Sequence, residues 1–192
     1  MYVMTTDQQQ SRRNIDRLPE AFDALSHVPT IRSFDRTAGD EFQAVLDSAE
    51  AVTAAVIILA ELGHWSIGIG IGDVERPLPD QTRAGRGTAF ERARTAVTEA
   101  KRIPHPVAVV GTDPDTVSAA QTAQRLLALV VGERSEAGHA AVREMRRHRT
   151  QSEAAATLGV TPQAMSQRLR AANWYLEEDT RMLATRLLAA AR

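Results

Sequence analysis

The sequence predicts an α+β protein in which a sheet-containing N-terminal part precedes an all-helical C-terminal part. Short apolar runs alternate with helical patterns along residues 1–112, whereas only helical patterns follow from residue 113 onward. A Gly-containing turn between two short helical patterns near the C-terminus is the other observation behind this prediction. We therefore expect one domain at 1–112, a connector helix at 113–131 and a second domain at 132–192.

The N-terminal elements follow one another in the order β-α-β-β-α-β-α-β. Helices are predicted where apolar residues recur every three or four positions, and strands where short apolar runs are bounded by turn residues. The expected strands are 2–6, 30–36, 41–46, 64–74 and 105–110, and the expected helices are 14–25, 48–62 and 88–102. Helical crossovers around a central hairpin predict a mostly antiparallel sheet with helices on one face, which is the ferredoxin-like class.

The connector helix is predicted from Asp113-Pro114, a helix start signal, and from an apolar stripe over 116–131. Its second half carries more apolar side chains than one small neighbour would cover: Leu126, Leu127, Leu129, Val130 and Val131. Two interpretations stay open, because the helix would either contribute a homodimer contact or pack against its own N-terminal domain. Further helices are expected at 135–148, 153–158, 162–171 and 176–191.

The most informative stretch of the chain is QSEAAATLGVTPQAMSQRLRA, residues 151–171. Gly159 permits the backbone turn after the first helix, Thr161 is placed to cap the second helix, and Pro162 opens it. Ala155 is small enough for the two helices to cross closely. The apolar side chains spaced to fill the wedge between them are Leu158, Val160, Met165 and Leu169. This arrangement predicts a helix-turn-helix.

One face of the second helix presents hydrogen-bonding side chains at positions i, i+3, i+4 and i+7: Gln163, Ser166, Gln167 and Arg170. The stretch resembles the pattern A-x-x-L-G-[VI]-[ST] followed by V/M-S-x-x-L of bacterial DNA-binding regulators. We expect this face to contact the bases of double-stranded DNA. The side chains expected at the phosphates are Thr161, Gln151, Ser152, Arg147 and Arg168. Two alternatives stay open, in which the helices belong to an ordinary bundle or dock another protein.

Composition restricts the classes of function. The chain has no cysteine, which excludes disulfides, thiolate catalysis and cysteine-ligated zinc. It has neither a signal-peptide pattern nor an apolar run long enough for a membrane helix. Its 22 Arg against one Lys, with very high Ala, are typical of GC-rich bacterial genomes. We therefore expect a cytoplasmic bacterial protein that does not engage a membrane.

The net charge of −1 conceals an uneven distribution along the chain. Residues 132–192 hold ten Arg and seven acidic residues, a net charge of +3, which leaves −4 for residues 1–131. Six of these Arg lie between residues 143 and 170, so DNA phosphates are expected to meet this part of the chain. Because Arg is common throughout, its enrichment here is not by itself evidence of DNA binding.

The N-terminal part resembles nucleotide cyclases at several stretches in register. TAGDEFQAVL, residues 37–46, resembles the GGDEF turn of diguanylate cyclases and the hairpin of class III nucleotide cyclases. Asp7 ends the first strand, SIGIGIGDV occupies 66–74 and GTAFERAR occupies 87–94. Over residues 2–111 the chain is most similar to the SatD-like family, whose members pair GDEFQ with GIGIG. The resemblance implies that Asp7 and Asp40 hold Mg²⁺ against the phosphates of a nucleotide.

Other positions depart from the cyclase pattern. Phe90 stands where the transition-state Asn is found, and Arg36 stands where a base-selecting Lys is found. In the cyclases a carboxylate partners this base-selecting Lys, and near Arg83 this sequence has no residue that replaces that carboxylate. We therefore expect a degenerate cyclase-like domain that senses or dimerises without catalysis. Alternatively, the two carboxylates have structural roles. Asp40 would stabilise the hairpin turn, and Asp7 would cap the approach to the helix that follows it.

The run GIGIGD at 68–73 also resembles a dinucleotide-binding loop. Pro77 and Pro79 follow it where that loop would lead into a helix, so this interpretation fails. The glycines are instead expected to permit close approach of another backbone segment to the strand.

Together these observations predict a homodimeric DNA-binding protein, a transcriptional regulator without enzymatic activity. No cofactor is expected, although a nucleotide with Mg²⁺ is a candidate ligand of the N-terminal domain. The alternative is a metal-dependent nucleotide-binding or nucleotide-converting enzyme whose helical tail serves assembly.

Overall fold

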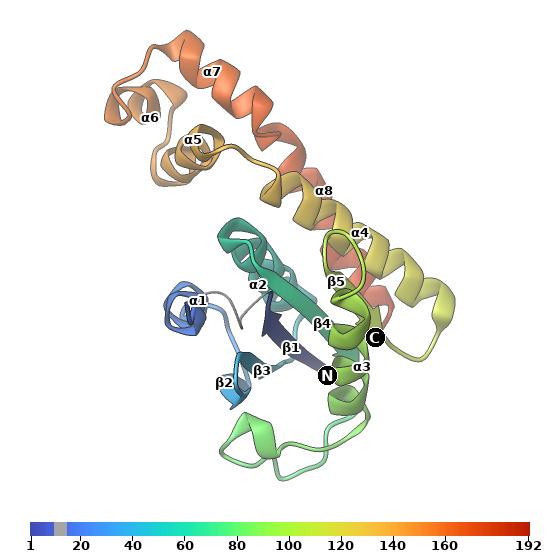
Figure 1. Ribbon diagram of the computed structural model, residues 1–192. Helices are drawn as coiled ribbons and strands as arrows, with labels where there is room; N and C mark the ends of the chain where they lie inside the picture. Colours follow the sequence, from blue (N-terminus) through green and yellow to red (C-terminus); the bar gives the residue numbers. More distant parts are fainter. Residues whose placement is uncertain (10–14) are drawn as a thin grey trace.

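A mixed five-stranded sheet forms the centre of the computed structural model, which describes residues 1–9 and 15–192 (Figure 1). The strands are β1 Tyr2–Gln8, β2 Arg32–Ala38, β3 Glu41–Leu46, β4 Trp65–Ile71 and β5 Val107–Val110. Their order across the sheet is β2-β3-β1-β4-β5, and neighbouring strands are antiparallel except for the parallel pair β4 and β5. The predicted α+β class is confirmed.

Strand β1 lies in the middle of the sheet because it pairs with β3 on one side and with β4 on the other. Met4 is opposite Ala44 of β3 and Ile69 of β4. Successive side chains of a strand point to opposite faces of the sheet. Met4 and Val3 accordingly enter two different apolar clusters, so both faces of the sheet are buried.

Helices cover both faces of the sheet. The helices are α1 Leu18–Leu25, α2 Ala49–Leu62, α3 Thr88–Ala100, α4 Pro114–Gly132, α5 Glu136–Arg147, α6 Gln151–Thr157, α7 Pro162–Ala171 and α8 Trp174–Ala190, with a short 3-10 helix, η2, at Thr82–Ala84. Residues of α1, α2, α4 and α8 pack on the face that carries Met4. Residues of α3 pack on the opposite face, against Val3.

The position of α3 corrects the expectation that all helices lie on one face of the sheet. Gly68 and Gly70 of β4 explain how α3 fits there. A Cβ atom on Gly68 would lie 2.2 Å from the backbone nitrogen of Val97, and one on Gly70 would lie 2.1 Å from the carbonyl oxygen of Ala89. The expectation that these glycines permit close backbone approach is therefore confirmed, and the approaching segment is α3.

Helix α1 is shorter than predicted. It begins at Leu18, with Pro19 in its first turn, whereas the expected start at residue 14 lies outside the described residues. Ile15, predicted on the apolar face of this helix, is 75% exposed because it precedes the helix. Phe22 does pack as expected, edge-on against Phe42 of β3 with ring centroids 5.3 Å apart.

The last helix lies along the sheet-containing part, which differs from its expected place in a C-terminal helical module. Helix α8 packs along α4 and against α2, and Ala184 and Leu188 are fully buried there. The Tyr2 hydroxyl donates a hydrogen bond to the carbonyl of Leu188 over 3.3 Å. We call the sheet with α1, α2 and α3, together with the parts of α4 and α8 that pack on it, the body. Helices α5, α6 and α7 form a head, which α4 and α8 join to the body as they run side by side (Figure 1).

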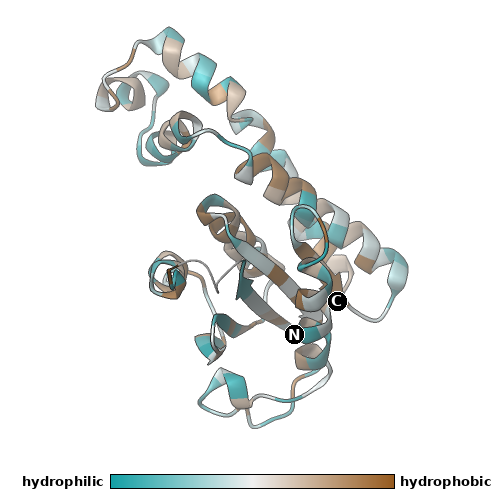
Figure 2. Ribbon diagram, viewed as in Figure 1, coloured by the Kyte–Doolittle hydropathy of each residue, from teal (hydrophilic) through white to brown (hydrophobic). Residues whose placement is uncertain are grey.

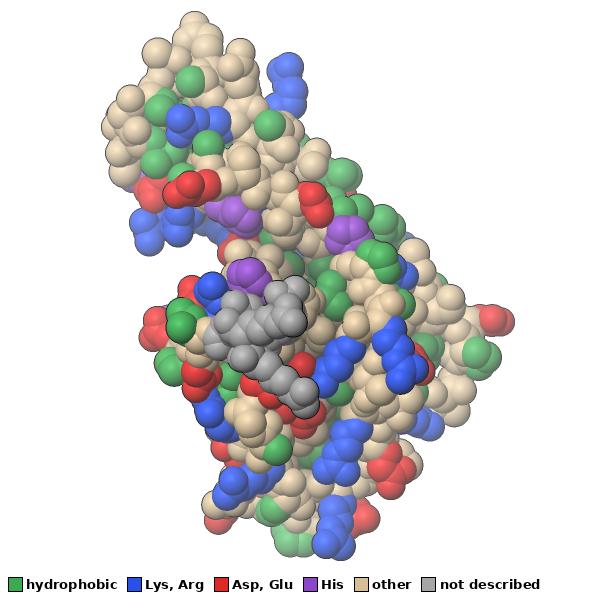
Figure 3. All heavy atoms as spheres, viewed as in Figure 1, with side chains coloured by type: hydrophobic (Ala, Val, Ile, Leu, Met, Phe, Trp, Pro, Cys, Tyr) green, Lys and Arg blue, Asp and Glu red, His purple; other side chains and the backbone are tan. Residues whose placement is uncertain are grey.

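Helices α4 and α8 show mixed hydropathy along their length, with brown apolar and teal polar positions on each ribbon (Figure 2). Ala123 of α4 and Ala184 of α8 are buried, whereas Leu126 and Met182 on the same helices are exposed, so each helix has a side that packs on the body and a side that meets solvent. Positively and negatively charged side chains are interspersed over the face of the molecule drawn in Figure 3. Over residues 1–9 and 15–192, no helix combines the length and apolarity needed to cross a lipid bilayer.

Candidate nucleic-acid interface

The head, α5 to α7, has a small apolar core of its own. Its buried members come from all three helices and the residue after α7: Ala141, Val142, Ala154, Ala155, Met165, Leu169 and Ala172. Leu158 and Val160 are partly buried against this core. The side chains expected to fill the wedge between the two helices therefore do so. Short side chains such as Ala155 permit this packing because they let the helices approach closely.

The turn between α6 and α7 depends on a left-handed residue. Gly159 has φ +64°, a conformation that side chains with a Cβ rarely adopt, although a Cβ there would meet no atom within 4 Å. The amide of Val160 then donates to the carbonyl of Ala155 over 3.0 Å. At the other end of α6, Thr150 and Glu153 form a reciprocal capping box. Both helix ends are thus fixed by local hydrogen bonds.

The predicted base-reading face of α7 is open to solvent. Gln163, Gln167 and Arg170 are exposed and Ser166 is half-buried. Met165 and Leu169, on the other side of the same helix, are fully buried and hold its orientation. Within the residues placed by the structure, the side chains of the four polar residues have no hydrogen-bond partner. Their donors and acceptors are therefore free for a ligand.

The predicted phosphate-contacting residues differ in their surroundings. The Thr161 hydroxyl accepts a hydrogen bond from the Ala164 amide over 3.1 Å, which is the predicted cap. Gln151 donates to the carbonyl of Pro162 over 3.1 Å and so ties the start of α6 to the start of α7. Ser152 is exposed beside it, and Arg168 is half-buried on α7. Three of these residues thus lie at the adjoining starts of α6 and α7.

Arg147 lies apart from that group. It belongs to α5 and forms an ion pair with Glu144 over 2.9 Å. It also lines a pocket whose opposite wall includes Ile58 and Leu62 of α2. Arg147 therefore faces the gap between head and body, and the structure does not bring it to the exposed face of α7.

A partly buried cluster of ion pairs joins head and body. Arg134, between α4 and α5, has a side chain only 1% exposed and lies 2.6 Å from Glu177 of α8. It also donates to the Ala172 carbonyl over 2.9 Å. Arg146 of α5 lies 2.6 Å from Glu177 and 2.7 Å from Glu61 of α2. Burial acts to lower the pKa of Arg146, but Glu61 and Glu177 outweigh it and raise that pKa.

This cluster changes the interpretation of the basic C-terminal segment. Arg146 was among the arginines expected to meet phosphates, yet both of its terminal nitrogens contact carboxylates. Its positive charge is therefore neutralised within the protein. No local sequence pattern predicts the cluster, because its members come from α2, the α4–α5 link, α5 and α8.

The two predicted metal ligands lie near one another at one end of β1. Asp7 is opposite Glu41 of β3 and Ser66 of β4. Asp40 lies in the turn between β2 and β3, where its carbonyl accepts a hydrogen bond from the Gln8 amide over 3.3 Å. Burial raises the pKa of Asp7, Lys101 acts to lower it, and the charge of Asp40 raises it further.

Lys101, the single Lys of the chain, already neutralises Asp7. Its Nζ atom lies 2.6 Å from Oδ2 of Asp7, at the end of α3. A divalent cation held by Asp7 would have to displace this ammonium group or use the other carboxylate oxygen. In the part of the chain that the structure describes, no three His, Cys, Asp or Glu side chains form a group that could hold a metal ion. A Mg²⁺ role for Asp7 and Asp40 stays a prediction.

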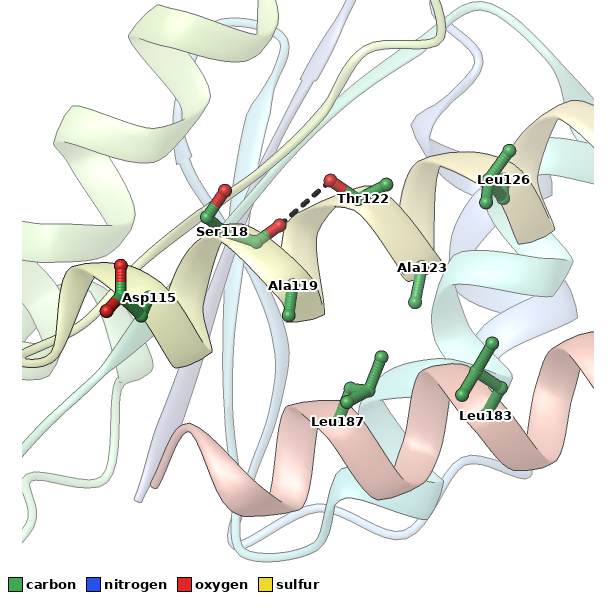
Figure 4. Close-up of a pocket in the computed structure, with 8 residues that line it drawn as sticks. All are labelled: Asp115, Ser118, Ala119, Thr122, Ala123, Leu126, Leu183 and Leu187. Carbon is green, nitrogen blue, oxygen red and sulfur yellow. Dashed lines mark hydrogen bonds between the residues drawn. The ribbon is translucent and has the colours of Figure 1, made fainter.

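An apolar groove of about 450 Å³ lies between α4 and α8. In Figure 4, Ala119 and Ala123 of α4 point toward Leu183 and Leu187 of α8. Leu126 at its edge is 48% exposed. Other large apolar side chains exposed on α8 are Tyr175, Leu176 and Met182. Helix α4 thus packs on its own body, as one interpretation predicted, and still presents apolar residues outward.

Comparisons with protein-family models, curated proteins and solved structures found no match to this chain.

Proposed function

We propose that the chain is a bacterial DNA-binding protein, a transcriptional regulator, that reads double-stranded DNA through a helix-turn-helix made of α6 and α7. The observation that carries this proposal is the face of α7 formed by Gln163, Ser166, Gln167 and Arg170. These side chains suit base edges in the major groove. They have no partners among the described residues, and the buried opposite side of α7 keeps them facing outward.

The starts of α6 and α7 would position the DNA backbone. Thr161, Gln151 and Ser152 gather there, and helix N-termini favour phosphate groups. Arg168 would add positive charge from α7. Arg147 would contact phosphate only if it left its ion pair with Glu144, so we give it a smaller role.

The body supports the inference of a ferredoxin-like, nucleotide-cyclase-like domain. The order β2-β3-β1-β4 with antiparallel neighbours is the one that a β-α-β-β-α-β unit forms, and β5 extends it in parallel. Phe90 is 1% exposed, so it offers no polar group where cyclases place an Asn. These features favour a sensing or dimerising role without catalysis.

Dimerisation would double the DNA contact, because one helix-turn-helix reads few base pairs. We assign the dimer contact to the exposed apolar residues of the α4–α8 groove, which include Leu126 and Leu183. Light scattering of the purified protein distinguishes one chain of 20.9 kDa from two.

Selection of bound fragments from random DNA tests the proposal, followed by anisotropy measurements on a selected duplex at fixed salt. Gln167→Ala and Arg170→Ala should each weaken binding by about 1 to 3 kcal/mol. Arg186→Ala is the matched control, because Arg186 is exposed on α8 and its loss changes the net charge equally. The proposal fails if no sequence is enriched, or if Arg186→Ala weakens binding as much as Arg170→Ala.

The proximity of Asp7 and Asp40 favours a second candidate, a metal-dependent enzyme acting on nucleotides. The full chain would be incubated with ATP or GTP and with Mg²⁺ or Mn²⁺. Cyclisation or hydrolysis that Asp40→Ala abolishes would establish this activity. Absence of turnover together with sequence-selective DNA binding would support the first candidate.

A further inference from the structure

A polar pocket of about 590 Å³ lies at the end of the body opposite Asp7 and Asp40. It is lined by Met1, the loop after β4, the start of α3, the link between β5 and α4, and the end of α8. Three arginines from different segments meet there: Arg76, Arg92 and Arg192. Asp73 is the one acidic side chain in the lining, so the charged side chains of the pocket sum to +2.

Among the residues that the structure describes, the three arginines have no carboxylate partner. In the described ranges 1–9 and 15–192, no ion pair within 4.0 Å involves Arg76, Arg92 or Arg192, and Asp73 pairs with none of them. Arg92 is half-buried and Arg76 and Arg192 are exposed, whereas Arg146 elsewhere in the protein contacts the carboxylates of Glu61 and Glu177. Like charges gathered in one pocket repel one another, and an anion bound among them would remove that cost.

Two of the guanidinium groups are held in place by neutral acceptors. Arg92 donates to the carbonyl of Ile71 over 2.5 Å and to the Thr112 hydroxyl over 3.0 Å, both from Nη1. Arg192 donates to the carbonyl of Asp47 over 2.9 Å. A guanidinium group has five N–H donors, so each retains several for a ligand. The groups are therefore oriented without being neutralised.

The backbone is shaped to admit one of these side chains. A Cβ atom on Gly72 would lie 2.5 Å from the Thr88 hydroxyl and 3.2 Å from Nη1 of Arg92. Glycine at this position therefore lets Thr88 and Arg92 approach the end of β4. The Ala89 amide is already bonded to the Asp73 carbonyl over 3.0 Å, so the recognition would come from side chains.

We propose that this pocket binds a small phosphorylated metabolite through Arg76, Arg92 and Arg192. A phosphate monoester carries about −1.5 to −2 charge at pH 7, which matches the +2 of the lining. The planar donors of arginine suit phosphate oxygens. The volume of about 590 Å³ is sufficient for a sugar phosphate or a mononucleotide.

The bound phosphate would also fasten two helices together. Thr112 precedes Asp113, the N-cap residue of α4, and Arg192 follows the end of α8. These helices run from the pocket region to the head (Figure 1). A ligand that contacts both Arg92 and Arg192 would restrain the body ends of α4 and α8.

Calorimetric titration of the full chain tests the site at constant ionic strength. The probes are inorganic phosphate, ribose 5-phosphate and AMP, with ribose as the uncharged control; the first two separate a free anion from a phosphorylated metabolite. Arg76→Ala should lower the affinity for the best probe about tenfold or more. Arg102→Ala, an exposed arginine outside the pocket, should change it less than twofold. Circular dichroism confirms that both variants are folded.

Hydrogen exchange locates the site independently of the variants. The phosphorylated probe should slow exchange at residues 112–117 and 186–192. The proposal is overturned if no probe binds saturably, if Arg102→Ala weakens binding as much as Arg76→Ala, or if protection appears only on the head. Binding of inorganic phosphate with no gain for either organic phosphate would overturn the assignment to a metabolite.

Discussion

The carboxylate of Glu177, on α8, contacts Arg146 of the head and Arg134 of the link between α4 and α5. It accepts hydrogen bonds from Arg134 and Arg146, each at 2.6 Å. Replacing Glu177 with Ala leaves the Arg134 guanidinium, 1% exposed, without its main partner. Removing one partner of a buried pair is strongly destabilising because the other charge stays buried and uncompensated. Glu177→Ala should therefore weaken the fold far more than loss of a surface carboxylate.

The expected magnitude follows from the geometry. Breaking a buried pair costs about 3 to 5 kcal/mol. We expect the lower end, about 3 kcal/mol, because Glu61 stays 3.7 Å from Arg134 and supplies some compensation. For a chain of this length, that loss corresponds to a melting temperature lower by about 6 to 12 °C.

Glu178 is a matched control on the same helix. It pairs with Arg181 over 2.6 Å, but its side chain is 60% exposed, so Glu178→Ala should cost no more than about 1 kcal/mol. Urea unfolding at pH 7 measures both variants. The double variant Arg134→Met with Glu177→Leu should recover part of the loss, because it removes both buried charges. Equal losses for Glu177→Ala and Glu178→Ala would refute the buried-pair argument.

Two further predictions concern the sheet. Gly68→Ala should cost about 1 to 3 kcal/mol in urea unfolding, because its Cβ meets backbone atoms of α3. Gly132→Ala, whose Cβ would lie 3.5 Å from its nearest neighbour, should cost nothing; similar losses for both would contradict this reasoning. Burial raises the pKa of Asp7 above 3.8, so its contribution to stability is greatest below pH 3.8 and falls as pH rises through the raised pKa. Asp7→Asn should remove this decrease from the pH profile of the unfolding free energy; an unchanged profile would contradict it.

Local sequence patterns were sufficient to predict most elements of the fold. Turn residues bound the β2–β3 hairpin, and Thr161 with Pro162 marks the start of α7, so both were placed within a few residues of their observed limits. The face on which α3 packs could not be inferred in the same way. Helix α3 packs on the side of β4 where Gly68 and Gly70 have no side chains. The two glycines show that some segment approaches closely there, but they do not show which helix it is.

The candidate sites show the same difference between local and distant information. The polar face of α7 was predictable because its members lie within eight residues of one helix. The ion pairs of Glu61 with Arg146, and of Arg134 with Glu177, join residues 85 and 43 positions apart. The three arginines of the polar pocket are likewise scattered over the chain. Only the folded chain brings such groups together.

The return of α8 to the sheet has a consequence for synthesis of the chain on the ribosome. Tyr2 and Leu188, joined by a hydrogen bond, are 186 positions apart. The apolar surface around β1 therefore stays partly uncovered until α8 has emerged, a state in which nascent chains are open to aggregation. The head makes its core contacts within residues 141–172 and can form them soon after that segment is translated. Of the five strands of the sheet, the one made first, β1, is thus among the last to be fully enclosed.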